Sequence, residues 1–328
     1  MSDVLVYDRP GAGHERRAVE VISRVLDAQS LIEPLDTALP KLKAWPGPVF
    51  LCTANGYVSV FNRICINRLL AGRRTIGQFI RDPRVYRENL RSAFRSGSLS
   101  LNRSRLLMEA VLRLPLVHPI STLPPAPDWP LRFRHWLYDP EWWDLSVAPL
   151  VDVDVPLQAG GQTVLYLGKV QHRKGTSFFL RAAQDAARRK AGLQFVIVGD
   201  ASELTDAQRT AFAAAGGLVI PRAEDDATFV SFIRRANWVW CCYEPAWEAS
   251  SGIFGRALQL GTKSIVRKAS YLAHFHSVYA KGIEVVYDDV DDLLEGLGSP
   301  DRWQNGSVDI ADLGAFSIRC LRASCGLR

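Results

Sequence analysis

The second half of the chain alternates apolar runs with amphipathic runs, and this alternation limits the possible folds most strongly. The runs "TVLYLG" from Thr163 and "LQFVIVG" from Leu193 are almost wholly apolar, and each leads into a helical pattern such as "KGTSFFLRAAQDAARRK". Strands that are apolar throughout are typical of parallel sheets that helices cover on both faces. This half is therefore predicted to be α/β, with ligands bound at the carboxyl ends of the strands.

The first half repeats this alternation, beginning with a short apolar strand at Val4 to Tyr7 and a helical pattern after it. From Thr122 to Gly161 the periodicity is lost and prolines and tryptophans accumulate, which favours a domain boundary. We predict an α/β chain with two facing Rossmann-like domains and a cleft between them. The domains are residues 1–155 and 156–310, and residues 311–328 form a C-terminal helix that packs back on the first domain.

Composition restricts the class of protein. The chain has 328 residues, of which 48% are hydrophobic and 23% are charged, which is typical of a folded globular protein long enough for two domains. No run reaches the roughly 18 to 20 apolar residues of a membrane-spanning helix, and no signal peptide is recognisable. The six cysteines fit neither zinc nor disulfide spacing. We expect a cytoplasmic protein with reduced, mostly buried cysteines.

Positive charge is concentrated in one segment. The formal net charge is +6, but residues Arg63 to Arg113 alone hold 12 arginines against Asp82, Glu88 and Glu109, a balance of 12 − 3 = +9. Such a segment favours a polyanionic partner, and two interpretations stay open: a helix face against an anionic membrane surface, or a solvated arginine-rich face. Nucleic acid is disfavoured because the segment lacks an aromatic stacking platform.

Three loops that follow predicted strands carry candidate binding residues. In "LGKVQHRKG", Gly168 ends a strand, and Lys169 and Lys174 flank a turn into a helix. Two ammonium groups at such a turn, together with helix amides, can hold one anion such as pyrophosphate, although solvated lysines are the alternative. In "PGAGHERR", Gly11 and Gly13 lack the third glycine of a dinucleotide fingerprint, and His14 is either a helix cap or a catalytic group.

The third loop is "EASSGIFGRALQLGT", from Glu248 to Thr262. Ser250 or Ser251 can cap the helix that follows, and Gly261 suits a left-handed helix end. Glycines at the start of a helix allow close approach of a ligand, and the amides there suit phosphate, although such residues are also simply good caps.

The second half resembles the donor-binding domain of the retaining GT-B glycosyltransferases, in particular glycosyltransferase family 4. The resemblance extends from about Thr163 to Val266 and rests on "VLYLGKVQHRKG" and "YEPAWEASSGIFGRALQLGT" in the expected order. It implies that Lys169 and Lys174 hold the donor diphosphate and that Glu248 lies beside the donor sugar. It also implies a turn around the phosphates, which comprises Gly252, Ile253, Phe254 and Gly255, with Gly168 near the nucleotide.

The sequence departs from this family at two positions. Arg256 stands where the family has a second glutamate, which holds the ribose, so we expect Arg256 to face the nucleotide, where it either alters donor choice or marks lost activity. Asp82 follows Arg81 where relatives have a His-Asp pair, and it either activates the acceptor hydroxyl or pairs with a nearby arginine. Gly11, Gly13 and His14 would form the acceptor-side loop.

The resemblance implies a hexosyltransferase-like enzyme that transfers a sugar from a nucleotide-sugar donor to an acceptor hydroxyl with retention. The acceptor would be a glycan or a lipid-linked molecule in polysaccharide or glycolipid biosynthesis, which would suit a peripheral position at the inner face of a membrane. No cofactor and no metal site are expected, because lysines and helix amides can neutralise the leaving diphosphate. The alternatives are an inactive binding or scaffold protein of the same fold and another nucleotide-sugar enzyme such as an epimerase.

Overall fold

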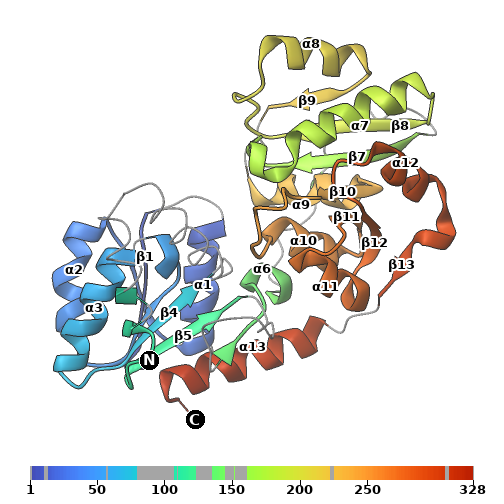
Figure 1. Cartoon of the computed structure of the whole chain (residues 1–328). Helices are drawn as coiled ribbons and strands as arrows, with labels where there is room; N and C mark the ends of the chain where they lie inside the picture. Colours follow the sequence, from blue (N-terminus) through green and yellow to red (C-terminus); the bar gives the residue numbers. More distant parts are fainter. Residues whose placement is uncertain are drawn as a thin grey trace. The chain divides into compact units, whose positions relative to one another are not determined.

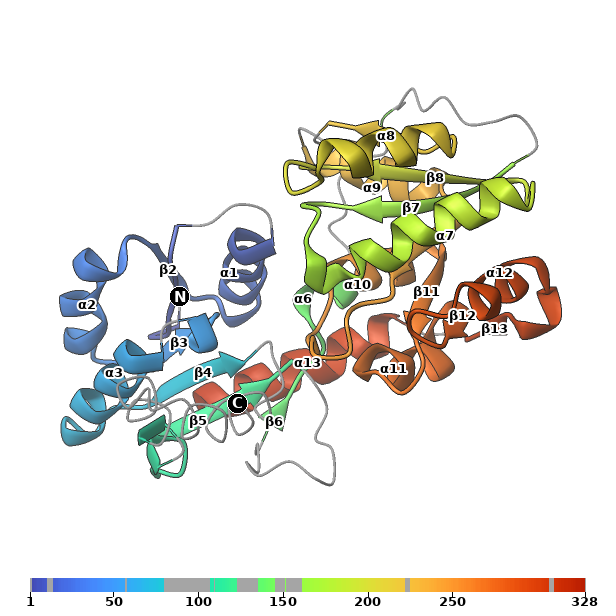
Figure 2. The ribbon, with the colours of Figure 1, turned by 45° about the horizontal axis from the view of Figure 1, so that its top comes forward.

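The computed structural model is α/β throughout (Figure 1). It describes residues 2–10, 14–56, 58–79, 107–108, 110–122, 135–144, 151, 161–221, 225–306 and 310–327. The described strands form one sheet of six and one of seven strands, and helices pack against both (Figure 2). The predicted α/β fold class is therefore confirmed.

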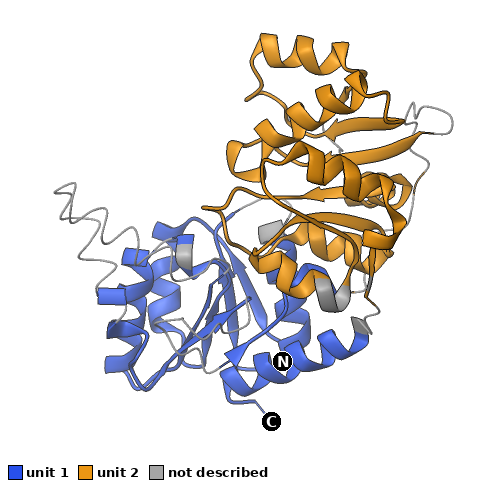
Figure 3. Cartoon of the chain, turned by 45° about the vertical axis from the view of Figure 1, so that its right-hand side comes forward, with its two compact units in different colours: residues 1–143, 311–328 blue, residues 144–310 orange. Residues whose placement is uncertain are grey.

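The chain divides into two compact units (Figure 3). Unit 1 comprises residues 1–143 and 311–328, and unit 2 comprises residues 144–310. Most of the basic segment beyond residue 79 and most of the region from 122 to 161 lie outside the described residues.

Unit 1 contains a parallel sheet in the order β2-β1-β3-β4-β5-β6. Its strands are β1 (Leu5–Asp8), β2 (Gln29–Ile32), β3 (Val49–Leu51), β4 (Thr75–Phe79), β5 (Val117–Ser121) and β6 (His135–Trp136). Its helices are α1 (His14–Leu26), α2 (Leu35–Ala44), α3 (Val58–Leu70), α6 (Pro140–Trp143) and α13 (Ile310–Cys325). Helix α2 contacts α3, and α1 contacts α6.

The C-terminal helix α13 is part of the core of unit 1. The fully buried hydroxyl of Ser317 accepts a hydrogen bond of 3.1 Å from the amide of Tyr138. The ring of Phe316 lies 4.6 Å from that of Trp136, and Arg74 donates to the carbonyl of Ser324. These contacts join the last residues of the chain to residues more than 170 positions earlier.

Two arginines of unit 1 bind the carbonyl groups at the end of α2. Arg68 is fully buried and donates to the carbonyls of Leu42 and Trp45 at 2.8 and 2.9 Å. It also donates to Gly47 at 2.6 Å, and Arg73 donates to the carbonyls of Lys43 and Ala44. The last carbonyls of a helix have no partner within it, so these guanidinium groups replace the missing donors. Burial lowers the pKa of Arg68 to about 10.

Unit 2 contains the sheet β13-β12-β11-β10-β7-β8-β9, which is parallel except for β13. Its strands are β7 (Gln162–Leu167), β8 (Leu193–Val198), β9 (Leu218–Ile220), β10 (Trp238–Cys241), β11 (Lys263–Arg267), β12 (Lys281–Val285) and β13 (Gln304–Asn305). Its helices are α7 (Thr176–Arg188), α8 (Asp206–Ala214), α9 (Asp226–Arg235), α10 (Gly252–Leu260), α11 (Tyr271–Tyr279) and α12 (Val290–Gly298).

The core of unit 2 is aromatic. Phe178 and Phe179 of α7 both meet the ring of Trp240 edge to face, at 5.3 and 5.2 Å between centroids. Helix α7 also contacts α8 and α12, while α10 contacts α9. Aromatic residues bury large apolar areas, and edge-to-face pairs add a preferred orientation.

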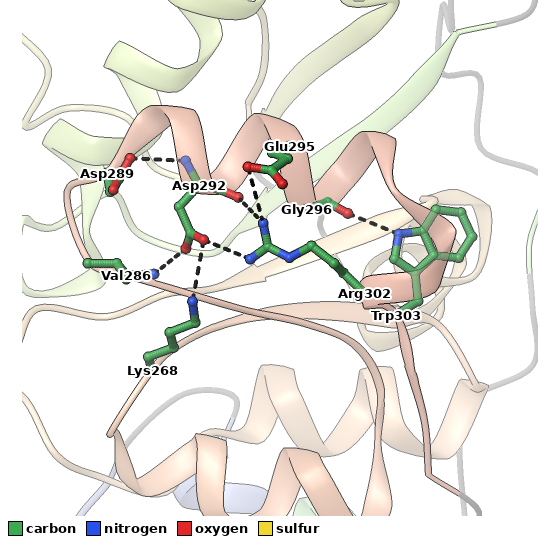
Figure 4. A network of polar contacts seen from close by, with 8 residues as sticks. All are labelled: Lys268, Val286, Asp289, Asp292, Glu295, Gly296, Arg302 and Trp303. Atoms are coloured by element: carbon green, nitrogen blue, oxygen red, sulfur yellow. Dashed lines mark hydrogen bonds and ion pairs between the residues drawn. The ribbon is translucent and has the colours of Figure 1, made fainter.

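A polar network fixes the start of α12 (Figure 4). The carboxylate of Asp292 accepts from the amide of Val286 at 2.6 Å, from Arg302 at 2.7 Å and from Lys268 at 3.3 Å. Burial acts to raise the pKa of Asp292, but these hydrogen bonds outweigh it and the pKa is lowered. Trp303 donates to the carbonyl of Gly296 at 3.0 Å, which secures the end of the same helix.

The sequence predicts no membrane-spanning helix and mostly buried cysteines, and the structure bears on both. Within the described ranges, no helix is long and apolar enough to cross a membrane. Five of the six cysteines are buried, and Cys320 is half-buried.

Arg68→Met should destabilise unit 1 by about 3 kcal/mol or more, because several buried carbonyls lose their donor. The control is Arg63→Met, which changes an exposed arginine on the same helix and should shift stability by no more than about 0.5 kcal/mol. Urea unfolding with hydrogen exchange of the β3 and β4 amides gives both values. Equal losses of unfolding free energy in the two variants would show that the buried carbonyls do not need Arg68 as a donor.

Candidate functional site

The carboxyl edge of the unit 2 sheet holds most of the predicted site residues. Strands β7, β10 and β11 are neighbours with parallel partners, so the loops after Leu167, Cys241 and Arg267 leave the sheet at the same edge. Ligands of open α/β sheets bind at this edge.

Lys174 is half-buried in the loop between β7 and α7. Its ammonium group donates to the carbonyl of Leu167 at 3.1 Å and lies 5.9 Å from the centre of the Tyr166 ring. A side chain at Gly168 would place its Cβ 3.1 Å from the ammonium, so the glycine leaves room for it. Burial, with a smaller contribution from the charge of Arg173, lowers the pKa of Lys174 to about 8. This lysine can therefore change charge near neutral pH.

The same loop is held firmly on the end of β10. Gly175 has a left-handed backbone with φ +73°, and a Cβ there would lie 2.2 Å from the carbonyl oxygen of Cys242. The indole of Trp240 donates to the carbonyl of Lys174 at 2.9 Å. The hydroxyls of Tyr166 and Thr176 are 3.0 Å apart and share a hydrogen bond. Lys174 is thus positioned by backbone contacts on both sides.

Helix α10 begins at the same edge. Ser251 caps it, since its hydroxyl accepts from the amide of Phe254 at 3.1 Å and lies 2.7 Å from the hydroxyl of Tyr243. The amides of Gly252 and Ile253 have no acceptor among the residues that the structure describes. Free amides and the positive end of the helix dipole form a site suited to an anion. Phe254 itself is fully buried, so only its backbone belongs to this site.

Cys241 connects the two parts of the site. Burial raises the pKa of its thiol to about 12, while hydrogen bonds to Tyr243 and Ser251 and the charge of Lys174 act in the opposite direction. Lys174 is therefore near enough to act on this thiol through its charge, and the Ser251 cap is within hydrogen-bond reach of it. The structure brings together the lysine and the helix start that the sequence placed in two separate loops.

Lys169 points elsewhere. Its ammonium is 3.3 Å from the carboxylate of Glu203, and both side chains are about half exposed, at 49% and 46%. Exposed ion pairs contribute little free energy, so a bound anion could compete for this lysine. Joint action of Lys169 and Lys174 on one anion stays a prediction.

Glu248 has both carboxylate oxygens engaged. One oxygen pairs with the guanidinium of Arg267, and the other accepts from the amide of Tyr271, at the start of α11, at 2.8 Å. The cavity beside this group has a volume of about 10 Å³, which is room for about one water molecule. The carboxylate is thus held by two donors, while about 20% of its side chain stays exposed.

Arg256 has partners that differ from the expected ones. It is 6% exposed and donates to the carbonyl of Asp144, the first residue of unit 2, at 3.3 Å and to the side chain of Gln259 at 2.7 Å. Gln259 donates to the same carbonyl at 3.2 Å. We expected Arg256 to face a nucleotide, but its contacts are internal because a buried guanidinium requires acceptors.

The acceptor-side predictions in unit 1 fall largely outside the described residues. This applies to Gly11, Gly13 and Asp82, while His14 begins α1 but its side chain is not described. Within the basic segment, Arg68 and Arg73 bind backbone carbonyls and are therefore part of the internal structure.

Sequence reasoning missed Arg267, which pairs with Glu248, and Tyr243, which contacts the Ser251 cap. One signal for Arg267 was available: a charged residue ends the otherwise apolar strand "SIVR" at the edge where ligands bind. Among the described residues, no three His, Cys, Asp or Glu side chains lie together so that they could hold a metal ion.

Comparisons with known proteins identify the fold. No family model matches the sequence, and the comparison with curated protein sequences finds no match. The structure is similar to Anabaena Alr3699/HepE in complex with UDP and glucose, at 10% identity and TM-score 0.60 over 99% of this chain and 94% of that one. It is also similar to sucrose-phosphate synthase from Thermosynechococcus elongatus, at 12% identity and TM-score 0.57 over 98% and 93%.

A third similar structure is WaaG, a glycosyltransferase involved in lipopolysaccharide biosynthesis, at 12% identity and TM-score 0.54 over 98% of this chain and 94% of that one. These similarities extend over nearly the whole chain, so they include both Rossmann-like units. The chain has the GT-B fold, as the sequence predicted.

Gly175→Ala should destabilise unit 2 more than Gly192→Ala does. Gly192 has a similar φ of +67° but no atom within 4 Å of an added Cβ, so its substitution measures backbone strain alone, about 1 kcal/mol. The clash with Cys242 should cost about 2 kcal/mol more at Gly175. Urea unfolding of both variants measures the difference. Equal losses of unfolding free energy would contradict the close packing of this loop against Cys242.

Proposed function

We propose that this protein is a glycosyltransferase that moves a sugar from a nucleotide-sugar donor to an acceptor hydroxyl. The observation that carries the proposal is that Lys174 and the start of α10, where the amides of Gly252 and Ile253 have no acceptor among the described residues, lie at the same edge of the unit 2 sheet. A cation and a helix start at one place suit a diphosphate, which is the leaving group of such a donor.

The similar structures support this choice of ligand. HepE is described in complex with UDP and with UDP-glucose, and WaaG is described as a glycosyltransferase. We transfer to this chain only the class of reaction, and UDP and UDP-glucose serve as the first probes.

In the proposed reaction, the bond between the sugar and the diphosphate breaks and negative charge develops on the leaving oxygen. The acceptor oxygen bonds to the same sugar carbon, and the proton of its hydroxyl passes to the leaving diphosphate. The protonated Lys174 and the amides of Gly252 and Ile253 would stabilise this charge, which would make a metal ion unnecessary. Groups already fixed in place stabilise a transition state without further reorganisation, and the contacts of Gly175 and Trp240 hold Lys174 in this way.

We further propose that transfer proceeds with retention and that Glu248 orients the donor sugar. Both its oxygens already have donors, from Arg267 and from the Tyr271 amide, which favours an orienting role over covalent attack. The pocket beside Glu248 holds about one water molecule, so a sugar would approach the carboxylate from its exposed side.

Unit 1 would bind the acceptor, a glycan or a lipid-linked molecule of polysaccharide or glycolipid biosynthesis. The loop with Gly11, Gly13 and His14, together with Asp82, is the proposed acceptor side. The basic segment Arg63 to Arg113 would place the protein at an anionic membrane surface from the cytoplasmic side. Sedimentation with anionic vesicles tests this, and absence of binding at low salt would remove the membrane contact.

A second candidate is a binding protein of the same fold without transfer activity. Arg256 favours it, because this arginine stands at the position of the family's ribose-binding glutamate, has no carboxylate to offer and donates to Asp144 and Gln259. Binding of UDP without any consumption of UDP-glucose or of other nucleotide sugars would support this candidate.

The affinity for UDP should fall as pH rises through about 8. Lys174 is protonated and attracts the diphosphate below its pKa of about 8, and it is neutral above it. Calorimetric titration between pH 7 and pH 9 should show this decrease in the wild type, and Lys174→Met should bind UDP with no such dependence. A wild-type affinity constant over this range would contradict the role of Lys174.

At pH 7, Lys174→Met should weaken UDP binding about 10- to 100-fold, the effect of one charge-assisted hydrogen bond. Lys190→Met is the matched control, because Lys190 is exposed beyond the opposite end of α7 and its loss should leave binding unchanged. If both variants bind UDP equally well, the proposed phosphate site is wrong.

A further inference from the structure

We propose that Arg267 is a positioning residue that orients Glu248 and, with it, the loop between β10 and α10. This inference rests on the proposed function, because it assigns a purpose to Glu248 as the carboxylate that orients the donor sugar. Arg267 lies at the end of β11, at the same sheet edge as Lys174.

The guanidinium of Arg267 has three acceptors at this edge, two on the loop after β10 and one on the residue that follows Arg267 in the chain. It donates to the carbonyl of Tyr243 at 3.1 Å, to the carbonyl of Lys268 at 3.4 Å, and to the carboxylate of Glu248. The residue is 8% exposed, so all three interactions lie in a low-dielectric region where they are strong. Arg267 therefore ties both ends of the segment from Tyr243 to Glu248 to the end of β11.

Helix α11 completes the arrangement. Its first amide, on Tyr271, donates to the second oxygen of Glu248 at 2.8 Å, and Ser270 caps the helix through the amide of Ala273 at 3.1 Å. A carboxylate at a helix start is stabilised by the helix dipole. Glu248 thus has a donor on each oxygen, one from β11 and one from α11, and these two donors fix the plane of its carboxylate.

The orientation of Glu248 affects the phosphate site as well. Glu248 is three residues before Ser251, whose hydroxyl caps α10, and Tyr243 contacts that hydroxyl. Arg267 holds the carbonyl of Tyr243 and the side chain of Glu248, and both residues belong to the loop that carries the cap. Movement of this guanidinium would change both the orientation of the Glu248 carboxylate and the position of the start of α10.

Lysine could not replace Arg267. An ammonium group is a single point charge, whereas the planar guanidinium presents donors in a fixed fork that reaches a carbonyl and a carboxylate at once. Arg267→Lys should therefore keep the charge but recover only part of the function.

A double-mutant cycle tests the proposal in the full chain, with the variants Arg267→Met, Glu248→Gln and both together. The first measurement is the midpoint of thermal unfolding. If the two side chains act as one unit, the double variant should melt no lower than the less stable single variant. If the decreases in melting midpoint of the two single variants simply add in the double variant, the pairing of Arg267 with Glu248 is overturned.

The second measurement is the steady-state consumption of UDP-glucose. Arg267→Met should lower kcat about tenfold or more while KM for UDP-glucose changes less than about threefold, and the double variant should match Glu248→Gln. Arg267→Lys should lie between Arg267→Met and the wild type. Losses in kcat that multiply in the double variant would overturn the positioning role while leaving the proposed function intact.

Arg302→Met is the matched control. Arg302 is another partly buried arginine of unit 2 that pairs with carboxylates, Asp292 and Glu295, in the network at α12 (Figure 4). Its loss should lower the melting midpoint but leave kcat and KM unchanged. If Arg302→Met lowers kcat as Arg267→Met does, the effect is general destabilisation and the proposal fails. A last outcome separates this proposal from the proposed function. If the wild type neither binds UDP nor consumes UDP-glucose, but the decreases in melting midpoint of the two single variants still do not add in the double variant, the proposed function fails and the Arg267–Glu248 pair is purely structural.

Discussion

The candidate site of unit 2 depends on the contact between the loop after β7 and the end of β10. Gly175 approaches the carbonyl of Cys242 so closely that no side chain fits between them, and Trp240 donates to the neighbouring carbonyl of Lys174. This contact brings a half-buried ammonium group to the edge where α10 begins. Because the same burial lowers the pKa of Lys174 to about 8, the packing of the loop also sets the charge of the site.

Buried arginines that bind backbone carbonyls are a second organising feature. Arg68 holds the end of α2 in unit 1, Arg256 holds the carbonyl of Asp144, and Arg267 holds that of Tyr243. A guanidinium has five donors and no acceptor, so one side chain can satisfy several carbonyls that no regular hydrogen bond reaches. Several arginines of this basic chain therefore donate hydrogen bonds within the protein rather than to a partner.

The sequence was sufficient to predict much of the fold. The apolar strands of unit 2 follow from local patterns, and so does a helix capped by Ser250 or Ser251, of which Ser251 is the cap. Gly261 has the left-handed conformation expected at the end of α10, with φ +66°. Strand β2 was missed because its residues are mostly exposed and lack an apolar run. Strand β12 was also missed, although it is mostly buried, because its short segment mixes charged residues and a glycine with its apolar ones.

The site could be predicted only in part, because partners distant in sequence decide what a side chain does. Lys174 and Ser251 were identified from their loops, but nothing local indicates that Lys169 faces Glu203 or that Arg256 faces Asp144, 112 positions away. The pairing of Glu248 with Arg267 likewise depends on the order of β10 and β11 in the sheet. Local patterns identify which residues are available, and tertiary contacts determine their use.

A crystal structure of the full chain with UDP bound would show where the diphosphate lies. It should be within hydrogen-bond distance of the Lys174 ammonium and of the amides of Gly252 and Ile253, with the Gly175 contact unchanged. UDP bound at another place, with the start of α10 empty and Lys174 still donating only to Leu167, would contradict the proposed phosphate site.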